Sequence, residues 1–251
     1  MGKKKRRKES KSRKNYNFSK QIKESLYEYN EYSTFDSNKG FDYRVEPKGI
    51  NQESYFRKLQ DNNKKIVIAT GPAGTGKTLL ASYTGIKNFG IKYDKIIITR
   101  PVMTVDENIG FLPGSLEDKM KPWMTPLFDI FNKYYYQNEI KCMINEKVIE
   151  ICPLAFMRGR TFENCWIIAD EMQNATKNQM KMLLTRIGKG SKLILTGDLK
   201  QNDRKDSDNG LEDFLNRVKE NSPRYITFQE FENIDIKRCD VVKEVLKMYD
   251  D

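Results

Sequence analysis

The sequence predicts an α/β domain with a mostly parallel sheet and helices on both of its faces. Short apolar runs of strand length alternate along the chain with longer stretches of helical length, and a glycine-rich turn joins the first apolar run directly to a helical stretch. Such alternation is typical of a parallel sheet, in which a helix connects successive strands. The expected strands cover residues 64–70, 95–100, 148–152, 166–169, 192–196 and 224–228.

The turn after the first expected strand occupies residues 71–78 and has the spacing G-x-x-x-x-G-K-S/T. Gly71, Gly74 and Gly76 would let backbone N–H groups converge on phosphate oxygens where a side chain would collide. A buried strand before the turn and a helix after it are the context that this motif requires. We therefore expect a nucleotide-binding loop. The expected contacts are Gly71, Pro72, Ala73, Gly74, Thr75, Gly76, Lys77 and Thr78.

Two side chains at the end of this loop have the chemistry that nucleotide hydrolysis needs. Lys77 would reach the β and γ phosphates and is a candidate catalytic residue. Thr78 would place its hydroxyl on Mg²⁺, a cation that prefers oxygen ligands.

A pair of acidic residues, Asp170 and Glu171, follows directly after the apolar strand that ends at Ala169. Such a pair is often only a turn or a helix cap, but beside a phosphate loop it is the expected partner of that loop. Asp170 would then hold Mg²⁺, directly or through a water molecule. Glu171 would orient and polarise the water that attacks the γ-phosphate.

A third expected strand ends at Thr196-Gly197-Asp198, and Gln201 follows three residues later. Gln201 could sense whether the γ-phosphate is present, whereas the alternative for Thr-Gly-Asp is a polar turn after a strand. Between the acidic pair and this strand, helical spacing predicts one apolar stripe that packs in the core. Its members are Met180, Leu183, Leu184 and Ile187.

Residues 115–136 begin like a capped helix and carry apolar side chains at helical intervals, although Pro122 and Pro126 would break or kink it. The segment is rich in aromatic residues and includes Tyr134-Tyr135-Tyr136. These rings could stack on nucleic-acid bases, but a buried face or a subunit contact is the favoured interpretation.

The composition is that of a single domain with extensions. The chain has 251 residues, no histidine and four cysteines without C-x-x-C pairing, which disfavours a zinc site and excludes hydrolases that depend on a catalytic histidine. We find no apolar run of bilayer length and no secretory signal, so we expect a soluble, cytoplasmic protein without a membrane partner.

Charge is concentrated at the beginning of the chain. Residues 1–14 contain six lysines, three arginines and one glutamate, a net charge of +8 out of a total of +10. This tail is expected to be disordered. One interpretation is an electrostatic arm that binds RNA, DNA or a receptor for targeting signals, and the alternative is a solvated tail of no consequence. Residues 15–45 are expected to form a linker or loosely ordered segment, and residues 46–251 the domain itself.

Taken together, the motifs resemble those of the PhoH family, the phosphate-starvation-inducible ATPases related to superfamily-one helicases. The resemblance covers about residues 47–249. It rests most specifically on the Met-Arg-Gly-Arg-Thr string that ends at Thr161 and on the Gly-Phe-Leu-Pro-Gly string at 110–114. The remaining matches, in order, are Asn51-Gln52, residues 71–78, Thr99-Arg100-Pro101, Pro153-Leu154-Ala155-Phe156, residues 170–174, residues 185–188, Thr196-Gly197-Asp198 with Gln201, and Asp235 with Arg238.

The resemblance implies a single RecA-like P-loop NTPase domain that uses ATP and Mg²⁺. Gln52 takes the place of the glutamine that reads adenine in related helicases, although an Asn-Gln pair near a helix start could also be a cap. Arg100 lies where relatives of this fold contact a nucleic-acid strand, and its alternative is a structural arginine that pairs with a carboxylate.

The resemblance also implies a homo-oligomer, because helicases of this superfamily take a further positive charge from a second RecA-like domain that this chain is too short to contain. A neighbouring subunit in a ring, by resemblance a hexamer, would supply that arginine. Arg238 is assigned as the catalytic candidate, although the chain continues it with Cys239-Asp240 where the family commonly has His-Pro. The other candidates are Arg186, Arg160 and Arg158.

The resulting expectation is a Mg²⁺-dependent ATPase that couples hydrolysis to binding or remodelling of RNA or single-stranded nucleic acid, with possible RNA helicase activity. Two alternatives stay open. One is a nucleotide-gated scaffold in RNA processing, and the other is a small-molecule kinase, against which the acidic pair and Gln201 argue by favouring water as the acceptor.

Overall fold

The computed structural model describes residues 44–101, 125–201 and 209–237, together with residues 241, 244 and 248. The expectations for the basic tail, for most of the linker, for the Gly-Phe-Leu-Pro-Gly string and for Arg238 lie outside the described residues. Val45, the last residue of the expected linker, packs against the apolar core.

Six strands in the described part of the chain form one sheet in which every neighbouring pair is parallel. The order across the sheet is β3-β2-β4-β5-β1-β6, so β5 separates β1, which precedes the phosphate loop, from β4, which precedes the acidic pair. This architecture confirms the predicted α/β fold of one RecA-like P-loop domain. The strands are β1 (Ile66–Thr70), β2 (Lys95–Thr99), β3 (Ile149–Ile151), β4 (Cys165–Ala169), β5 (Lys192–Gly197) and β6 (Ile226–Glu230).

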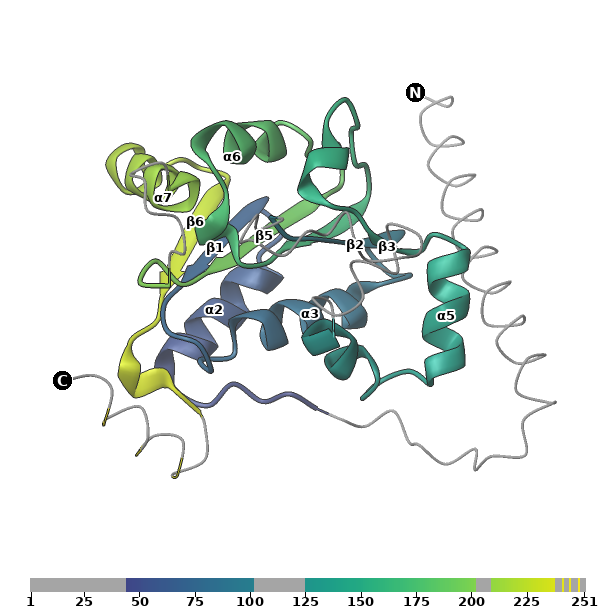
Figure 1. Cartoon of the computed structure of the whole chain (residues 1–251), viewed down its shortest axis with the longest axis horizontal. Helices are drawn as coiled ribbons and strands as arrows, with labels where there is room; N and C mark the ends of the chain where they lie inside the picture. The colour runs from purple at the N-terminus through teal and green to yellow at the C-terminus, as the bar shows by residue number, and fades with distance from the viewer. Residues whose placement is uncertain are drawn as a thin grey trace, which may run out of the picture.

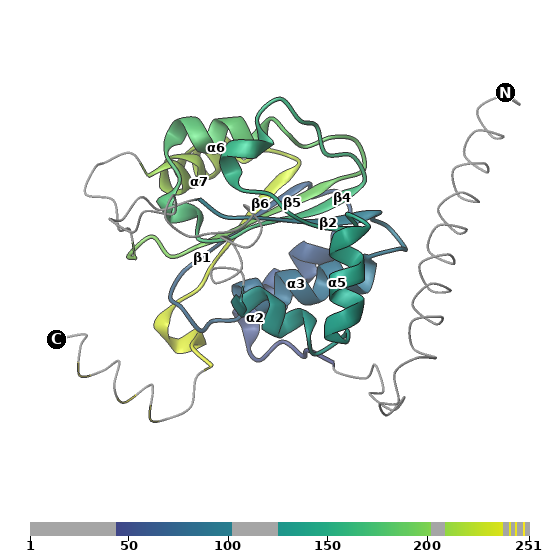
Figure 2. The same cartoon turned by 45° about the vertical axis from the view of Figure 1, so that its right-hand side comes forward.

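The helices lie on both faces of the sheet, as predicted (Figures 1 and 2). One face carries α2 (Ile50–Gln60), α3 (Lys77–Asn88) and α5 (Gln137–Asn145). The other face carries α6 (Lys177–Leu184) and α7 (Gly210–Asn221).

Several element boundaries differ from the sequence prediction by one or more residues, and two of these differences have a cause visible in the structure. The last strand begins at Ile226 instead of residue 224, because Arg224 and Tyr225 form a turn in which the Tyr225 carbonyl accepts from Lys65 N and Ile66 N. The strand pairs with β1 only from Ile226 onward.

The second difference concerns the helix expected over 115–136. Within the described residues the helix covers 125–131, and a turn follows over 132–134. A separate helix, α5, then begins where the Tyr136 backbone N–H donates to Glu139 Oε2 at 2.6 Å. Tyr134 is buried with its ring 5.8 Å from that of Tyr83, which agrees with the packing interpretation of this aromatic segment.

Alternation along the strands divides the apolar core into two layers. In β1, Val67 and Ala69 face the layer under α2 and α3, whereas Ile66 and Ile68 face the layer under α6 and α7. Both faces of the sheet are covered, which is why its strands read as continuous apolar runs. Of the stripe predicted for α6, Met180 and Leu183 are buried, while Ile187 lies beyond the helix end and packs against the same layer.

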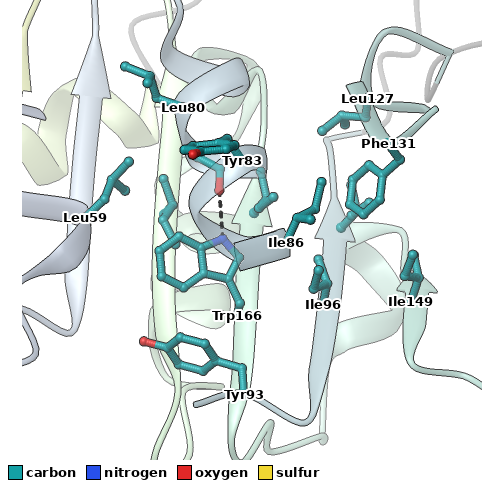
Figure 3. Close-up of a cluster of buried hydrophobic side chains, with 14 of the residues drawn as sticks. Leu59, Leu80, Tyr83, Ile86, Tyr93, Ile96, Leu127, Phe131, Ile149 and Trp166 are labelled. Atoms are coloured by element: carbon teal, nitrogen blue, oxygen red, sulfur yellow. Dashed lines mark hydrogen bonds between the residues drawn. The ribbon is translucent and has the colours of Figure 1, made fainter. Parts of the chain in front are cut away.

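Trp166 fixes α3, the helix that follows the phosphate loop, against β4 (Figure 3). Its indole Nε1 donates to the Ala81 carbonyl at 3.1 Å, and Tyr93 packs edge-on at 5.2 Å between ring centroids. A Cβ on Gly85 would lie 2.5 Å from the indole, so only glycine allows this close approach. The Trp166 contacts therefore help to hold the helix after the phosphate loop in a fixed position against the acidic strand.

Three described cysteines, Cys142, Cys152 and Cys165, are free thiols. None of the helices in the described ranges combines the length and the apolar character that crossing a bilayer requires.

Candidate nucleotide-binding site

The glycine-rich loop connects β1 to α3 at the carboxyl edge of the sheet. Gly71, Gly74 and Gly76 have φ angles of 133°, 84° and 85°, which L-residues rarely adopt. A Cβ on Gly71 would collide with the Phe231 carbonyl, and one on Gly76 would lie 2.9 Å from the Gln52 amide. The glycines therefore meet a local requirement of the backbone as well as leaving space for phosphate.

Lys77 is folded back onto its own loop. Its Nζ donates to Gly71 O at 2.6 Å and to Pro72 O at 2.7 Å, and it lies 3.3 Å from Thr75 Oγ1. Burial lowers the pKa of Lys77, while the nearby carboxylates, Asp198 foremost, act in the opposite direction. Phosphate oxygens could take the place of the two carbonyl oxygens that the ammonium now uses.

Thr78 and Asp170 are in direct contact, although the strands that precede them, β1 and β4, lie on either side of β5. Thr78 Oγ1 donates to Asp170 Oδ1 at 2.9 Å. The hydroxyl of Thr196, in the intervening strand β5, donates to the same carboxylate oxygen. One carboxylate and one hydroxyl at the edge of a phosphate loop are a hard oxygen donor set, which fits Mg²⁺.

Glu171 stands beside Asp170 in a left-handed conformation, with φ 54°, that is costly for a residue other than glycine. Its Oε2 accepts from Gln173 Nε2 at 2.6 Å, and its Oε1 lies 3.7 Å from Arg100 Nη2. Of the two roles weighed for Arg100, the ion pair with a carboxylate is present. Both carboxylate oxygens of Glu171 thus have partners within the chain.

The turn after β5 lies on the other side of Gln173. Asp198 N donates to Gln173 Oε1 at 3.1 Å, and Gln173 Nε2 lies 3.3 Å from the Gln201 carbonyl. The Gln201 side chain is exposed. Sequence reasoning noticed Gln173 only as part of the string 170–174, and the one available signal was an amide placed two residues after the acidic pair.

Gln52 is buried against the loop itself. Its Nε2 donates to Thr75 O at 2.9 Å, and its Oε1 accepts from Lys48 N at 2.7 Å. Both ends of the amide are thereby bound to backbone, so Gln52 supports the shape of the loop. A contact between Gln52 and adenine stays a prediction.

A segment that sequence reasoning did not assign to the loop, the chain after β6, holds it from outside. Phe231 N donates to Thr70 O at 2.7 Å, and Lys237 N donates to Gly74 O at 3.0 Å. Asp235 accepts from Asn51 Nδ2 at 2.8 Å, which ties the segment to α2. The motif residue Asp235 therefore contributes to the support of the loop.

The candidate arginines differ in what surrounds them. Arg160 lies 2.5 Å from Glu150 and over the ring of Phe162, and Arg186 donates to the carbonyls of Met182 and Arg160. Arg158 is exposed and has no hydrogen bond or ion pair within the part of the chain that the structure describes. Arg238 lies outside that part.

Comparison with known proteins yields one family and several relatives. A sequence model of the family described as "PhoH-like protein" matches residues 44–250. A PhoH-like protein of Bacillus subtilis is 40% identical over 232 residues, which are 90% of this chain and 69% of that protein. A PhoH-like protein of Mycobacterium tuberculosis is 38% identical over 82% of this chain and 58% of its own length. Protein PhoH of Escherichia coli is 39% identical over 67% of this chain and 48% of its own length.

Proposed function

The chain belongs to the PhoH-like protein family and has a P-loop nucleotide-binding domain, and from this premise we propose that it is a Mg²⁺-dependent ATPase whose hydrolysis is coupled to single-stranded nucleic acid. The observation that carries the proposal is the contact of Thr78 Oγ1 with Asp170 Oδ1 at 2.9 Å. This contact brings the phosphate loop and the acidic strand end to one point, with Glu171 next to it.

The loop binds the triphosphate through backbone N–H groups at the start of α3, where the helix dipole also favours negative charge. Lys77 exchanges its two carbonyl partners for β- and γ-phosphate oxygens, which restores ion pairing to an ammonium that burial disfavours. Thr78 and Asp170 would hold Mg²⁺, which when bound neutralises charge on the phosphates.

Glu171 is the base. Its carboxylate accepts a proton from water as the water oxygen bonds to the γ-phosphorus, and the bond from that phosphorus to the bridging oxygen breaks to release ADP. Neither Asp170 nor Lys77 suits this task, because Asp170 already accepts from two hydroxyls and Lys77 is a donor. Glu171 reaches the water with Oε1, which must leave Arg100, while Oε2 keeps its hydrogen bond from Gln173.

The nucleic-acid part of the proposal is supported by charge. Residues 1–14 carry a net +8, and Arg100 places a side chain that is 29% exposed at the carboxyl end of β2. A strand bound there would meet the same guanidinium that now pairs with Glu171. If the tail contributes most of the affinity, binding weakens steeply with salt, and deleting residues 1–14 removes that dependence.

The oligomeric part of the proposal concerns the extra positive charge at the γ-phosphate. Arg160 and Arg186 have partners within the chain, whereas Arg158 is exposed without one in the described residues. We therefore place Arg158 beside Arg238 as a finger that a neighbouring subunit in a homo-oligomeric ring would supply. Arg158→Ala should lower turnover and leave ATP affinity unchanged.

The experiment is an ATPase assay with and without single-stranded RNA on the full chain, on Glu171→Gln and on the control Glu220→Gln, an exposed carboxylate of α7. We expect turnover that RNA stimulates, abolished by Glu171→Gln and unchanged by the control. Turnover unaffected by RNA would favour the scaffold, and phosphate transfer that needs a metabolite would favour the kinase. Full activity in Glu171→Gln would contradict the assignment of the base.

A further inference from the structure

The Gln173 side chain joins the proposed base to the turn after β5. Its Nε2 donates to Glu171 Oε2 at 2.6 Å and to the Gln201 carbonyl at 3.3 Å, and its Oε1 accepts from Asp198 N at 3.1 Å. An amide nitrogen has two N–H donors, and each has one acceptor here. The partners also fix the orientation of the amide, because a backbone N–H needs an oxygen opposite it.

The fold makes room for this amide. Gln173 is 2% exposed and lies in the short 3₁₀ turn Met172–Asn174 that follows the acidic pair. A Cβ on Gly197, in the neighbouring strand β5, would lie 2.7 Å from Gln173 Oε1. The same Cβ would lie 2.5 Å from Leu211 Cδ2, so a side chain at this position would have to displace both the buried amide and the Leu211 side chain.

The base is held in a conformation that its backbone does not favour. Glu171 has φ 54°, a left-handed conformation that is unfavourable for a residue with a side chain, so its surroundings must stabilise it. Gln173 supplies the shorter of the two contacts to the carboxylate, and Arg100 at 3.7 Å supplies the longer. Movement of the turn that contains Asp198 and Gln201 would therefore pull on the side chain that holds the base.

We propose that Gln173 is a positioning residue, which aims the Glu171 carboxylate and couples its orientation to the turn Asp198–Gln201. The proposal rests on the proposed ATPase function. When the γ-phosphate draws that turn toward the loop, the amide moves with it, and Glu171 becomes available to water. Gln173 touches neither substrate nor water in this scheme, and it acts only through Glu171.

The test compares Gln173→Met, which keeps the length of the side chain and removes the amide, with the exposed control Gln137→Met. We expect the turnover number of Gln173→Met to fall by about 10- to 100-fold, as small misplacements of a reacting group do. The affinity for a non-hydrolysable ATP analogue should stay within about twofold, because Gln173 makes no bond to the phosphate loop. Gln173→Asn keeps the amide but shortens its reach. If the methionine variant does not fold, the same measurements are made on Gln173→Asn.

The decisive measurement is a double-mutant cycle in single-turnover conditions. If Gln173 acts through the base, adding Gln173→Met to Glu171→Gln should lower the residual rate no further. An equal loss of rate in both backgrounds, or a wild-type turnover number in Gln173→Met and Gln173→Asn, would overturn the role of Gln173 and leave the ATPase function intact. A wild-type chain without ATP turnover would overturn the ATPase function, and this proposal with it.

Discussion

Lys77 and Lys192 are buried at opposite ends of the same sheet, and each donates to backbone carbonyl oxygens. Lys77 binds Gly71 O and Pro72 O, which belong to its own loop. Lys192, the first residue of β5, binds the carbonyls of Lys58, Leu59 and Asp61 at the end of α2, at 2.9, 2.5 and 3.0 Å. Burial lowers the pKa of both, in the case of Lys192 to about 7.

The surrounding charges separate the two lysines. Lys77 faces three carboxylates, Asp198, Asp170 and Glu171, whereas Lys192 has Asp61 opposed by two further lysines. The carbonyls that Lys192 binds lie at the end of α2, where the last carbonyls of a helix have no partner within the helix and need donors from elsewhere. The carbonyls that Lys77 binds belong to its own loop, and a bound phosphate could replace them as acceptors of the ammonium. From these contacts we expect Lys192 to be structural and Lys77 to be functional.

The largest expected effect that tests this comparison is on catalysis. Lys77→Ala should lower ATP turnover by about 10²- to 10³-fold, because the charge at the β and γ phosphates is lost. The melting temperature should change by about 2 °C or less, since burial already disfavours this ammonium in the folded state. Lys87→Ala, an exposed lysine of the same helix, is the control for both assays.

Lys192→Met should show the opposite pattern. Three helix-end carbonyls lose the Lys192 ammonium, and Asp61 O keeps a second donor in Lys64 N, so the free energy of unfolding should fall by about 3 kcal/mol, measured by denaturant titration. Turnover per folded molecule should match that of the wild type. Lys189→Met, at an exposed position before β5, should stay within about 0.5 kcal/mol. A loss of catalysis at full stability would contradict the structural role.

The pH dependence of stability sharpens the same point. Because the folded pKa of Lys192 is about 7 and the ordinary value is 10.5, the unfolded chain binds more protons between these values. The contribution of Lys192 to stability therefore rises with pH above about 7, by up to roughly 1.4 kcal/mol per pH unit. The stability difference between wild type and Lys192→Met, followed from pH 7 to pH 9, measures this. A flat difference would mean that the three carbonyls keep the ammonium charged.

Replacement of Lys58 should have the smallest effect on stability, and it shows how the cost of losing a lysine donor depends on burial. It is half-buried, and its Nζ donates to Phe228 O and Gln229 Oε1, both at 2.7 Å. Because water can replace a donor at this depth, Lys58→Met should cost about 0.5–1 kcal/mol in the same denaturant titration. A cost equal to that of Lys192→Met would show that burial does not distinguish the two sites.

Local pattern was sufficient for the strands. All six predicted strands are present, because both faces of a parallel sheet are buried and continuous apolar runs mark them. The errors are at boundaries where a turn decided the outcome, as at Tyr225 before β6 and after Phe131. Turns depend on individual backbone bonds that apolar pattern does not reveal.

For the site, the motifs were visible but their partners were not. Residues 71–78 and the acidic pair could be read from spacing, whereas the bond between Asn51 and Asp235 joins residues 184 positions apart. The burial of Lys192 left no trace in the sequence, since a lysine before an apolar run is ordinarily exposed.

By itself the sequence determined the class of fold, the phosphate loop and the two acids, because glycine geometry and apolar periodicity are properties of neighbouring residues. Only the tertiary structure decided that β5 lies between β1 and β4, so that Thr78, Thr196 and Asp170 meet, and that Gln173 holds Glu171. Those contacts depend on which strands lie next to each other in the sheet, and this spatial order arises from packing across the whole sheet.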